Sequence, residues 1–292
     1  MIAHRRLASP LHAARASAGG LFCIALTTAA LLYENPVVLA ATAVATIGAG
    51  ALAGVGRELA RAARFAVPIA LLVALINPFV VREGLTVFAR LGELPPLGQV
   101  DLTVEALVYG AVLGARVVVI VLAFALFTAA VNPDEVLRLF RRVSFRSALT
   151  ASLATRLLPV LARDGQRLAE ARRCRPDGGG SGGAARVAVL RAVTAGALDR
   201  AVDVAATLEV RGYAAAQRPP RTRAPWSRHD LAFMAAAVAI LVLAAGGRLT
   251  GVATFDADPR LAAEAGVPEF ALAGALVLVA LLPFADRRGI VR

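Results

Sequence analysis

The chain has 292 residues, of which 58% are hydrophobic, and its mean hydropathy is +0.69. Ordinary globular domains hold roughly 45–50% apolar residues, so this composition excludes a soluble protein. The formal net charge is +12, and because the sequence contains no lysine, all 32 basic residues are arginine. A phosphate-binding loop of the Walker type needs a lysine on the nucleotide phosphates, so we expect no ATPase site of that kind in this chain.

The cysteines and histidines indicate neither a disulfide framework nor a metal site. Cys23 lies in an apolar run and Cys174 in a charged run, so their placement suggests no pairing. His4, His12 and His229 are scattered without the spacing of metal ligands. We therefore expect no metal, no cofactor and no catalytic residue.

Apolar runs long enough to cross a membrane recur along the chain. A helix needs roughly 17–25 residues to cross a hydrocarbon core of about 30 Å. Six runs have about this length: 16–33, 37–56, 65–81, 106–131, 231–247 and 269–285. Glu34-Asn35-Pro36 predicts a tight hairpin between the first two, and the third is expected to kink or break at Asn77-Pro78. The predicted fold class is all-α, a polytopic membrane helix bundle of about six spans.

Arginines in the short connections predict the orientation. With both termini in the cytosol, the pieces 1–15, 57–64 and 286–292 hold nine arginines, whereas the external connections hold four. The sequence therefore predicts a cell-membrane protein with both termini cytosolic. The predicted domains are an N-terminal bundle of four spans at 1–131, a cytosolic segment at 132–230 and a C-terminal transmembrane hairpin at 231–292.

The cytosolic segment holds 18 arginines against nine acidic residues and begins with a helix signal. Asn132-Pro133-Asp134-Glu135 combines a capping asparagine, a proline in the first turn and acids near the positive end of the helix dipole. A short helix to about Arg142 is expected. A longer helix should follow from about 146 to 175, bent or broken near Pro159.

A second long helix is predicted from about Ala184 to Arg211. The glycine-rich run 178–183 before it should be a flexible tether, and Gly212 is a plausible C-cap. Each long helix carries a mostly apolar stripe along one face. In the helix 184–211 the stripe comprises Val187, Leu190, Thr194, Ala197, Ala201, Val204 and Leu208 and continues to Arg211. In the helix 146–175 it comprises Leu153, Leu157, Leu161 and Leu168 and continues to Arg175. Both long helices are therefore amphipathic, and each ends with an arginine. The dipole alone favours such an arginine by ~0.3–1 kcal/mol, so one ending is explained by capping, whereas two in tandem favour a function.

Several short motifs, taken together in their order over about residues 30–225, point to one family. They are Tyr33-Glu34-Asn35-Pro36, Ile76-Asn77-Pro78-Phe79, Leu102-Thr103-Val104-Glu105-Ala106-Leu107, Tyr109-Gly110, Gly114-Ala115-Arg116, Asn132-Pro133-Asp134-Glu135, Arg156-Leu157-Leu158-Pro159, Glu170-Ala171-Arg172-Arg173 and Leu208-Glu209-Val210-Arg211-Gly212-Tyr213. With these motifs in this order, the chain resembles the transmembrane T component of energy-coupling factor transporters, the CbiQ/EcfT family. These are ABC-type importers of vitamins and transition-metal ions.

The resemblance implies two cytosolic coupling helices, each ending in an Ala-Arg-Gly-like triplet, that dock in grooves of two ATPase subunits. The second triplet is Val210-Arg211-Gly212, preceded by Glu209. The first is Cys174-Arg175-Pro176, which differs at both flanks and follows Ala171. A substrate-binding membrane S component is the further partner implied, and it sets the transported substrate. The chain itself would be a transporter subunit and not an enzyme.

Arg116 lies inside the apolar run 106–131, where a charge costs several kcal/mol and usually faces the protein interior. Glu105 is eleven residues earlier, roughly 16 Å along the helix axis, so the two cannot pair directly. Arg116 either snorkels or caps a carbonyl group inside the bundle, or it contacts the substrate-binding subunit.

Two other classes of function were weighed. A membrane-anchored protein that binds anionic lipid or nucleic acid would use 132–230 as a basic patch. Nucleic-acid binding calls for aromatic side chains for stacking, and the segment offers only Phe140, Phe145, Tyr213 and Trp226. An intramembrane enzyme would need a motif such as HExxH, GxSxG or paired intramembrane aspartates, and none occurs within the six apolar runs. We expect the lipid bilayer, and no nucleic acid, among the partners.

Overall fold

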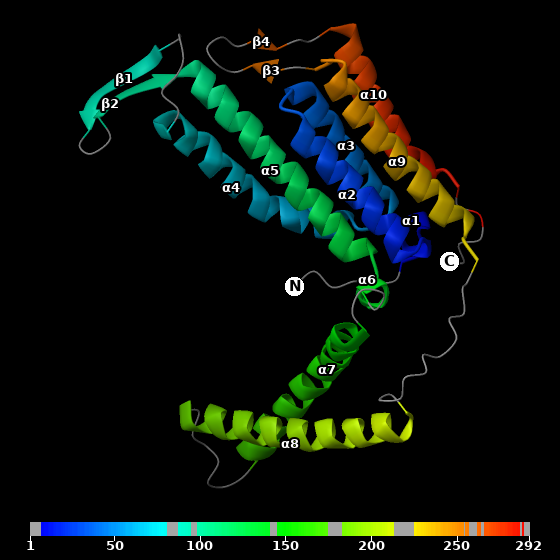
Figure 1. Cartoon of the computed structure of the whole chain (residues 1–292). Coiled ribbons are helices and arrows are strands. Elements are labelled where there is room, and N and C mark those ends of the chain that lie inside the picture. The colour runs from blue at the N-terminus through cyan, green and yellow to red at the C-terminus, as the bar shows by residue number, and fades with distance from the viewer. Residues whose placement is uncertain are drawn as a thin grey trace. The chain divides into compact units, whose positions relative to one another are not determined.

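The structure is a computed structural model that describes residues 7–80, 87–94, 98–140, 145–174, 183–212, 225–253, 255–256, 262–263, 266–286 and 288. The chain folds into two compact units. The first comprises residues 1–136 and 226–292, and the second comprises residues 137–225. Helices dominate both units (Figure 1), which confirms the predicted all-α fold class.

The first unit is a bundle of apolar helices. Its helices are α1 (Pro10–Ala13), α2 (Ala16–Leu32), α3 (Pro36–Leu52), α4 (Gly56–Val80), α5 (Val104–Ala130), α9 (Arg228–Leu249) and α10 (Val267–Leu281), which is followed by the short 3₁₀ helix η1 (Leu282–Phe284). Within the described residues, four stretches are long and apolar enough to cross a membrane: Gly56–Phe79, Val104–Ala130, Arg228–Leu249 and Val267–Phe284. α2 and α3 are apolar helices of 17 residues each. Each of the six predicted spans therefore corresponds to a helix of a membrane protein.

α2 and α3 form the predicted tight hairpin. Pro36 is the first residue of α3, and the Asn35 side chain accepts a hydrogen bond from the Val37 backbone N–H at 2.9 Å. This satisfies one of the amide groups that a helix start leaves without an internal partner. The turn is buried at Asn35 and at Tyr33, whose hydroxyl donates to the Ala244 carbonyl oxygen of α9 at 2.8 Å. The hairpin is thus fixed to a helix more than 200 residues away.

α4 corrects two expectations. Residues 57–64, predicted as a cytosolic connection, form the first turns of this helix, with Glu58 in the first turn, where the helix dipole favours an acid. The helix also does not break at Asn77-Pro78, because it continues to Val80 with Pro68 and Pro78 inside it. A proline leaves one carbonyl group of the preceding turn unbonded, and a neighbouring helix can compensate for that loss. The Asn77 side chain adds a contact between the two helices here, since it donates to the Ala106 carbonyl oxygen of α5 at 3.1 Å.

The core of the first unit gathers around α2, which packs against α5 and α9, while α3 packs against α10. Phe22 of α2 meets Phe233 and Phe284 edge to face, with ring centroids 5.3 and 6.4 Å apart. Much of the rest of the core is alanine, which lets the helix backbones approach closely, as is usual in membrane bundles. α4 packs chiefly against α5 and leaves most of its apolar surface exposed.

Two short antiparallel hairpins lie in the connections and were not predicted. β1 (Val87–Leu94) pairs with β2 (Gly98–Thr103), with Val87 opposite Thr103 and Leu94 opposite Gly98. β3 (Phe255–Asp256) pairs with β4 (Ala262–Ala263). Figure 1 shows β1 and β2 beyond the ends of α4 and α5, outside the bundle.

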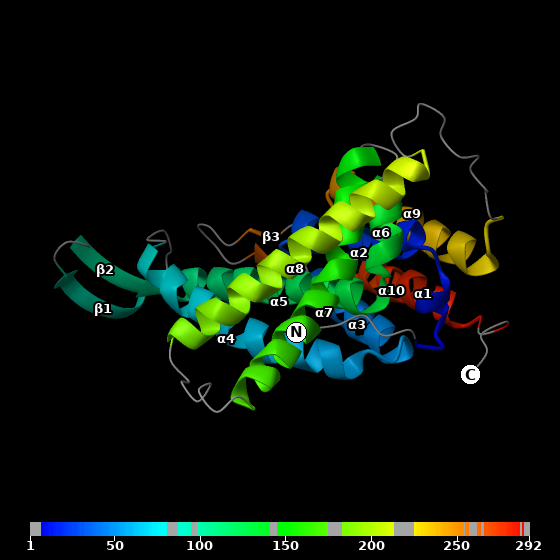
Figure 2. The same cartoon turned by 90° about the horizontal axis from the view of Figure 1, so that it is seen from below.

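The second unit contains two long helices that cross each other (Figure 2), α7 (Phe145–Arg173) and α8 (Gly183–Val210). They follow α6 (Pro133–Phe140), which starts as predicted, since the Asn132 side chain accepts from the Asp134 backbone N–H at 3.0 Å. α7 was expected to bend or break near Pro159, and it is not broken there, since the helix continues through this residue. The glycine tether lies outside the described residues except for Gly183, the first residue of α8.

The contact between α7 and α8 follows the predicted stripes only in part. In α7, Leu153, Leu157 and Leu161 are half-buried as expected, whereas Leu168 is exposed. In α8, the half-buried residues are Ala185, Val189, Val193, Ala197, Arg200, Val204 and Leu208. Of the predicted stripe, Ala197, Val204 and Leu208 are half-buried, whereas Val187, Leu190, Thr194 and Ala201 are exposed. Arg200 joins the contact through an ion pair with Asp164 of α7, with Nη2 and Oδ2 3.0 Å apart.

Candidate functional site

Arg211 stands at the end of α8, next to the glycine that caps the helix. The Gly212 backbone N–H donates to the Glu209 carbonyl oxygen at 2.9 Å, and Gly212 has a φ of +72°, a conformation that glycine adopts at no steric cost. The predicted C-cap is confirmed. The exposed Arg211 guanidinium makes no hydrogen bond or ion pair with any residue that the structure describes. The glycine backbone therefore caps the helix, and the arginine is not needed for capping.

The structure describes the end of α7 only as far as Cys174. Ala171 is exposed in the last turn, and the Cys174 backbone N–H donates to the Glu170 carbonyl oxygen at 3.2 Å. Arg172 turns towards α8, where one of its guanidinium nitrogens lies 3.4 Å from the Ala185 carbonyl oxygen. Arg175, the arginine expected to anchor this helix end on an ATPase subunit, lies outside the described residues.

α8 carries an apolar surface that no described residue of its own unit covers. Val187, Leu190, Leu198 and Val202 are each more than 60% exposed and are separated by steps of three, eight and four residues, so they share one face of the helix. None of the 28 residues of α8 is buried. A helix with an exposed apolar face is expected to pack against another surface.

Arg116 meets the α2–α3 turn and caps a carbonyl group, one of the two alternatives expected for it. Its Nη2 donates to the Tyr33 carbonyl oxygen at 3.1 Å and to Oε1 of Glu34 at 3.3 Å. Its side chain is 15% exposed, and that of Glu34 is 46% exposed. The contact arises from a difference in length: α5 is about 40 Å long and α2 only about 26 Å, so the polar end of α2 lies beside the middle of α5.

Glu105 lies apart from Arg116, in the first turn of α5. Its side chain is buried, and the helix start is capped by Thr103, whose Oγ accepts from the Ala106 backbone N–H at 3.3 Å. The acid that pairs with Arg116 is Glu34, which sequence reasoning missed. Its position in a turn between two spans, at the end of the shorter helices, was the available signal.

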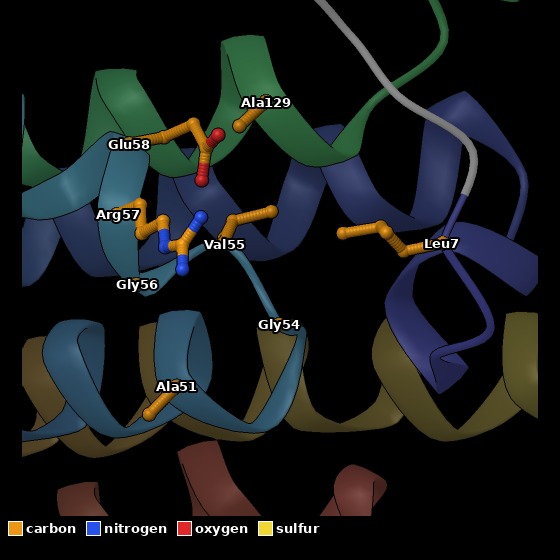
Figure 3. A pocket seen from close by; sticks show the side chains of 8 residues that line it. All are labelled: Leu7, Ala51, Gly54, Val55, Gly56, Arg57, Glu58 and Ala129. Atoms are coloured by element: carbon orange, nitrogen blue, oxygen red, sulfur yellow. The ribbon is translucent and has the colours of Figure 1, made fainter.

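A pocket of about 560 Å³ lies at the turn between α3 and α4, next to the last turns of α5. It is lined by Leu7, Ala51, Gly54, Val55, Gly56, Arg57, Glu58 and Ala129, and Figure 3 shows the side chains of Arg57 and Glu58 reaching towards it. None of the residues proposed for a site from the sequence lines this pocket. The part of the chain that the structure describes also holds no cluster of three or more histidine, cysteine or acidic side chains that fits a metal ion.

The fold and these features define a polytopic helical membrane protein with a separate unit of two long, largely exposed helices. The sequence matches the family described as cobalt transport protein, CbiQ, over residues 8–222. This is most of the chain, so the protein belongs to the CbiQ family, as its motifs suggested. A search of the curated proteins found no match.

Proposed function

We propose that this chain is the transmembrane coupling subunit, or T component, of an energy-coupling factor importer. It transmits the ATP-driven motion of two ATPase subunits to a substrate-binding S component, for uptake of a vitamin or a transition-metal ion. Membership of the cobalt transport family supports a transport role. The observation that carries the coupling role is the exposed helix α8, with its apolar face and its unengaged terminal arginine.

Arg211 is the proposed anchor on one ATPase, with Glu209 and Gly212 shaping the helix end. A guanidinium is a planar fork that binds a carboxylate through two parallel hydrogen bonds. Because Gly212 caps α8, Arg211 can leave the helix end for an acidic groove without uncapping a carbonyl group. Arg175, with Ala171 one turn before it, is the proposed counterpart at the end of α7.

The proposed orientation places both termini and the unit 137–225 on the cytosolic side of the cell membrane. The excess of arginine in the short connections on that side supports it. In this arrangement the ATP-binding sites belong to partner subunits, and the chain contributes no catalytic residue. Glu105 and Arg116 remain proposed contacts inside the membrane. For Arg116 we favour a contact within this chain, since its guanidinium already binds the Tyr33 carbonyl group.

The test is recovery of the ATPases with variants of the tagged subunit from detergent. Arg211→Ala should reduce the ATPase recovered and abolish uptake. Arg211→Lys, which keeps the charge but not the fork, should restore recovery only partly. Arg186→Ala is the matched control, since Arg186 is an exposed arginine near the other end of the same helix. Full recovery of the complex in the double Arg175→Ala/Arg211→Ala variant would refute the proposal.

A further inference from the structure

The start of α2 has an unusual cap. The N-cap residue is Arg15, whose side chain makes no capping hydrogen bond and carries a positive charge at the positive end of the helix dipole. The missing acceptors come from far along the chain. The Arg15 backbone N–H donates to Oδ1 of Asp230 at 2.7 Å, and the Ala16 backbone N–H donates to Oε2 of Glu135 at 3.0 Å. Two carboxylates therefore hold one helix start.

Asp230 joins two helices at once. Its side chain is 2% exposed, and its carboxylate caps α9 by accepting from the Ser227 backbone N–H at 2.8 Å and lies 3.2 Å from Nε of Arg15. The Arg15 guanidinium in turn lies over the ring of Trp226, 5.5 Å from its centroid. Charge-assisted hydrogen bonds from several donors fix the position of a buried carboxylate more firmly than neutral ones do.

These residues stand where the second unit is connected to the first. Glu135 is two residues before the second unit begins, and Trp226 directly follows its last residue. Both chain connections of residues 137–225 are therefore bound, through Glu135 on one side and Trp226 and Asp230 on the other, to Arg15 and Ala16. We call this set of five residues the α2 junction.

We propose that the α2 junction is the point at which movement of the unit 137–225 is delivered to the membrane bundle, with Arg15, Glu135 and Asp230 as positioning residues. This rests on the proposed coupling function. A displacement of either connection pulls on the amide groups at the start of α2, since the contacts are direct and short. α2 packs on α5 and α9, so its displacement would be passed to both.

Cys23 offers a native probe of this movement. It lies on α2, two turns after Ala16, and its side chain is buried, whereas Cys174 is exposed. In a Cys174→Ala background, Cys23 is the only thiol of the chain. The experiment uses the complete complex with its ATPases in lipid nanodiscs and measures the rate of Cys23 alkylation by N-ethylmaleimide, without nucleotide and with ATP and vanadate.

In the parent complex, the rate of Cys23 alkylation should differ between the nucleotide-free state and the state with ATP and vanadate. Asp230→Asn, and independently Glu135→Gln, should remove this dependence while the ATPases are recovered in unchanged amount and the melting temperature of the subunit shows that it is folded. Asp286→Asn is the matched control and should keep the dependence. The Arg288 backbone N–H lowers the pKa of the Asp286 carboxyl, so the control also removes a charged group, outside the junction.

Each contrary result has its own meaning. The inference is overturned if the Cys23 alkylation rate in the parent complex is the same with and without nucleotide. It is also overturned if both folded variants keep the nucleotide dependence of the parent complex. In either case the coupling function stands. Loss of the ATPases from both variants would also overturn it, because the junction would then support docking and not transmission. If the parent subunit binds no ATPase, the proposed function fails, and the inference fails with it.

Discussion

The contact between α4 and α5 rests on two glycines of α5, and replacing one of them by alanine tests it. An added Cβ at Gly114 would lie 2.6 Å from the Ala70 carbonyl oxygen, and one at Gly110 would lie 2.9 Å from that of Ala74. Both obstacles are backbone atoms, which cannot rotate away as a side chain can. Gly114→Ala therefore requires the two helices to separate.

The required shift follows from the same geometry. An ordinary contact at this position begins near 3.4 Å, so α4 must move by several tenths of an ångström along its contact with α5. Overpacking of this kind costs about 1–3 kcal/mol. Replacing a helical glycine by alanine also stabilises the helix by about 0.5–1 kcal/mol. The matched control must share that gain, and Gly274→Ala in α10 does, since an added Cβ there meets nothing within 4 Å.

Thermal unfolding in detergent gives the measurement, followed by the reaction of buried Cys23 with a thiol-reactive dye in a Cys174→Ala background. Gly114→Ala should melt below Gly274→Ala, by about 2–4 °C for each kcal/mol of destabilisation. Equal melting temperatures would refute the reasoning, because they would show that α4 is not seated on the Gly114 backbone.

Three further changes have expected outcomes by the same assay. Arg116→Met should destabilise the bundle by about 1–3 kcal/mol, because the Tyr33 carbonyl group loses its donor inside the protein, and Arg116→Lys should recover part of this. Tyr33→Phe should cost about 0.5–1.5 kcal/mol through loss of the hydrogen bond to Ala244, and no loss at all would contradict the buried contact. A double-mutant cycle on Asp164 and Arg200 should give a coupling of only about 0.2–1 kcal/mol that falls with salt, since both side chains are partly exposed; a larger, salt-independent value would show that the pair is shielded from solvent.

The positions of the spans could be predicted from the sequence because the membrane imposes a length and a composition on each helix. The helix ends outside the spans followed from local chemistry. Asn132 and Gly212 each act within a few residues of their own position, through a side-chain acceptor in one case and a positive φ in the other. Signals of this kind need no knowledge of the rest of the fold.

What could not be predicted depends on partners that are distant in the sequence. The pairing of Arg116 with Glu34 follows from the difference in length between α2 and α5, which appears only when the two helices lie side by side. The face of α8 that meets α7 includes Arg200, whose partner Asp164 lies on α7 and does not follow from the apolar pattern of α8. Proline in α4 predicted a kink or a break, yet the helix continues through Pro78, next to the point where the Asn77 side chain donates to the Ala106 carbonyl oxygen of α5.

α2 combines these long-range contacts in one element. Its first amide groups are held by the carboxylates of Asp230 and Glu135, and its last carbonyl groups meet Arg116 at Tyr33. Between these ends, seven of the 17 residues are alanine or glycine, and Phe22 packs edge to face against Phe233 and Phe284. A helix that is held by polar contacts at both ends can shift as a rigid body when one of these contacts is moved, and Phe22 would then carry the shift to Phe233 of α9. The polar ends of α2 therefore determine its position together with its apolar middle.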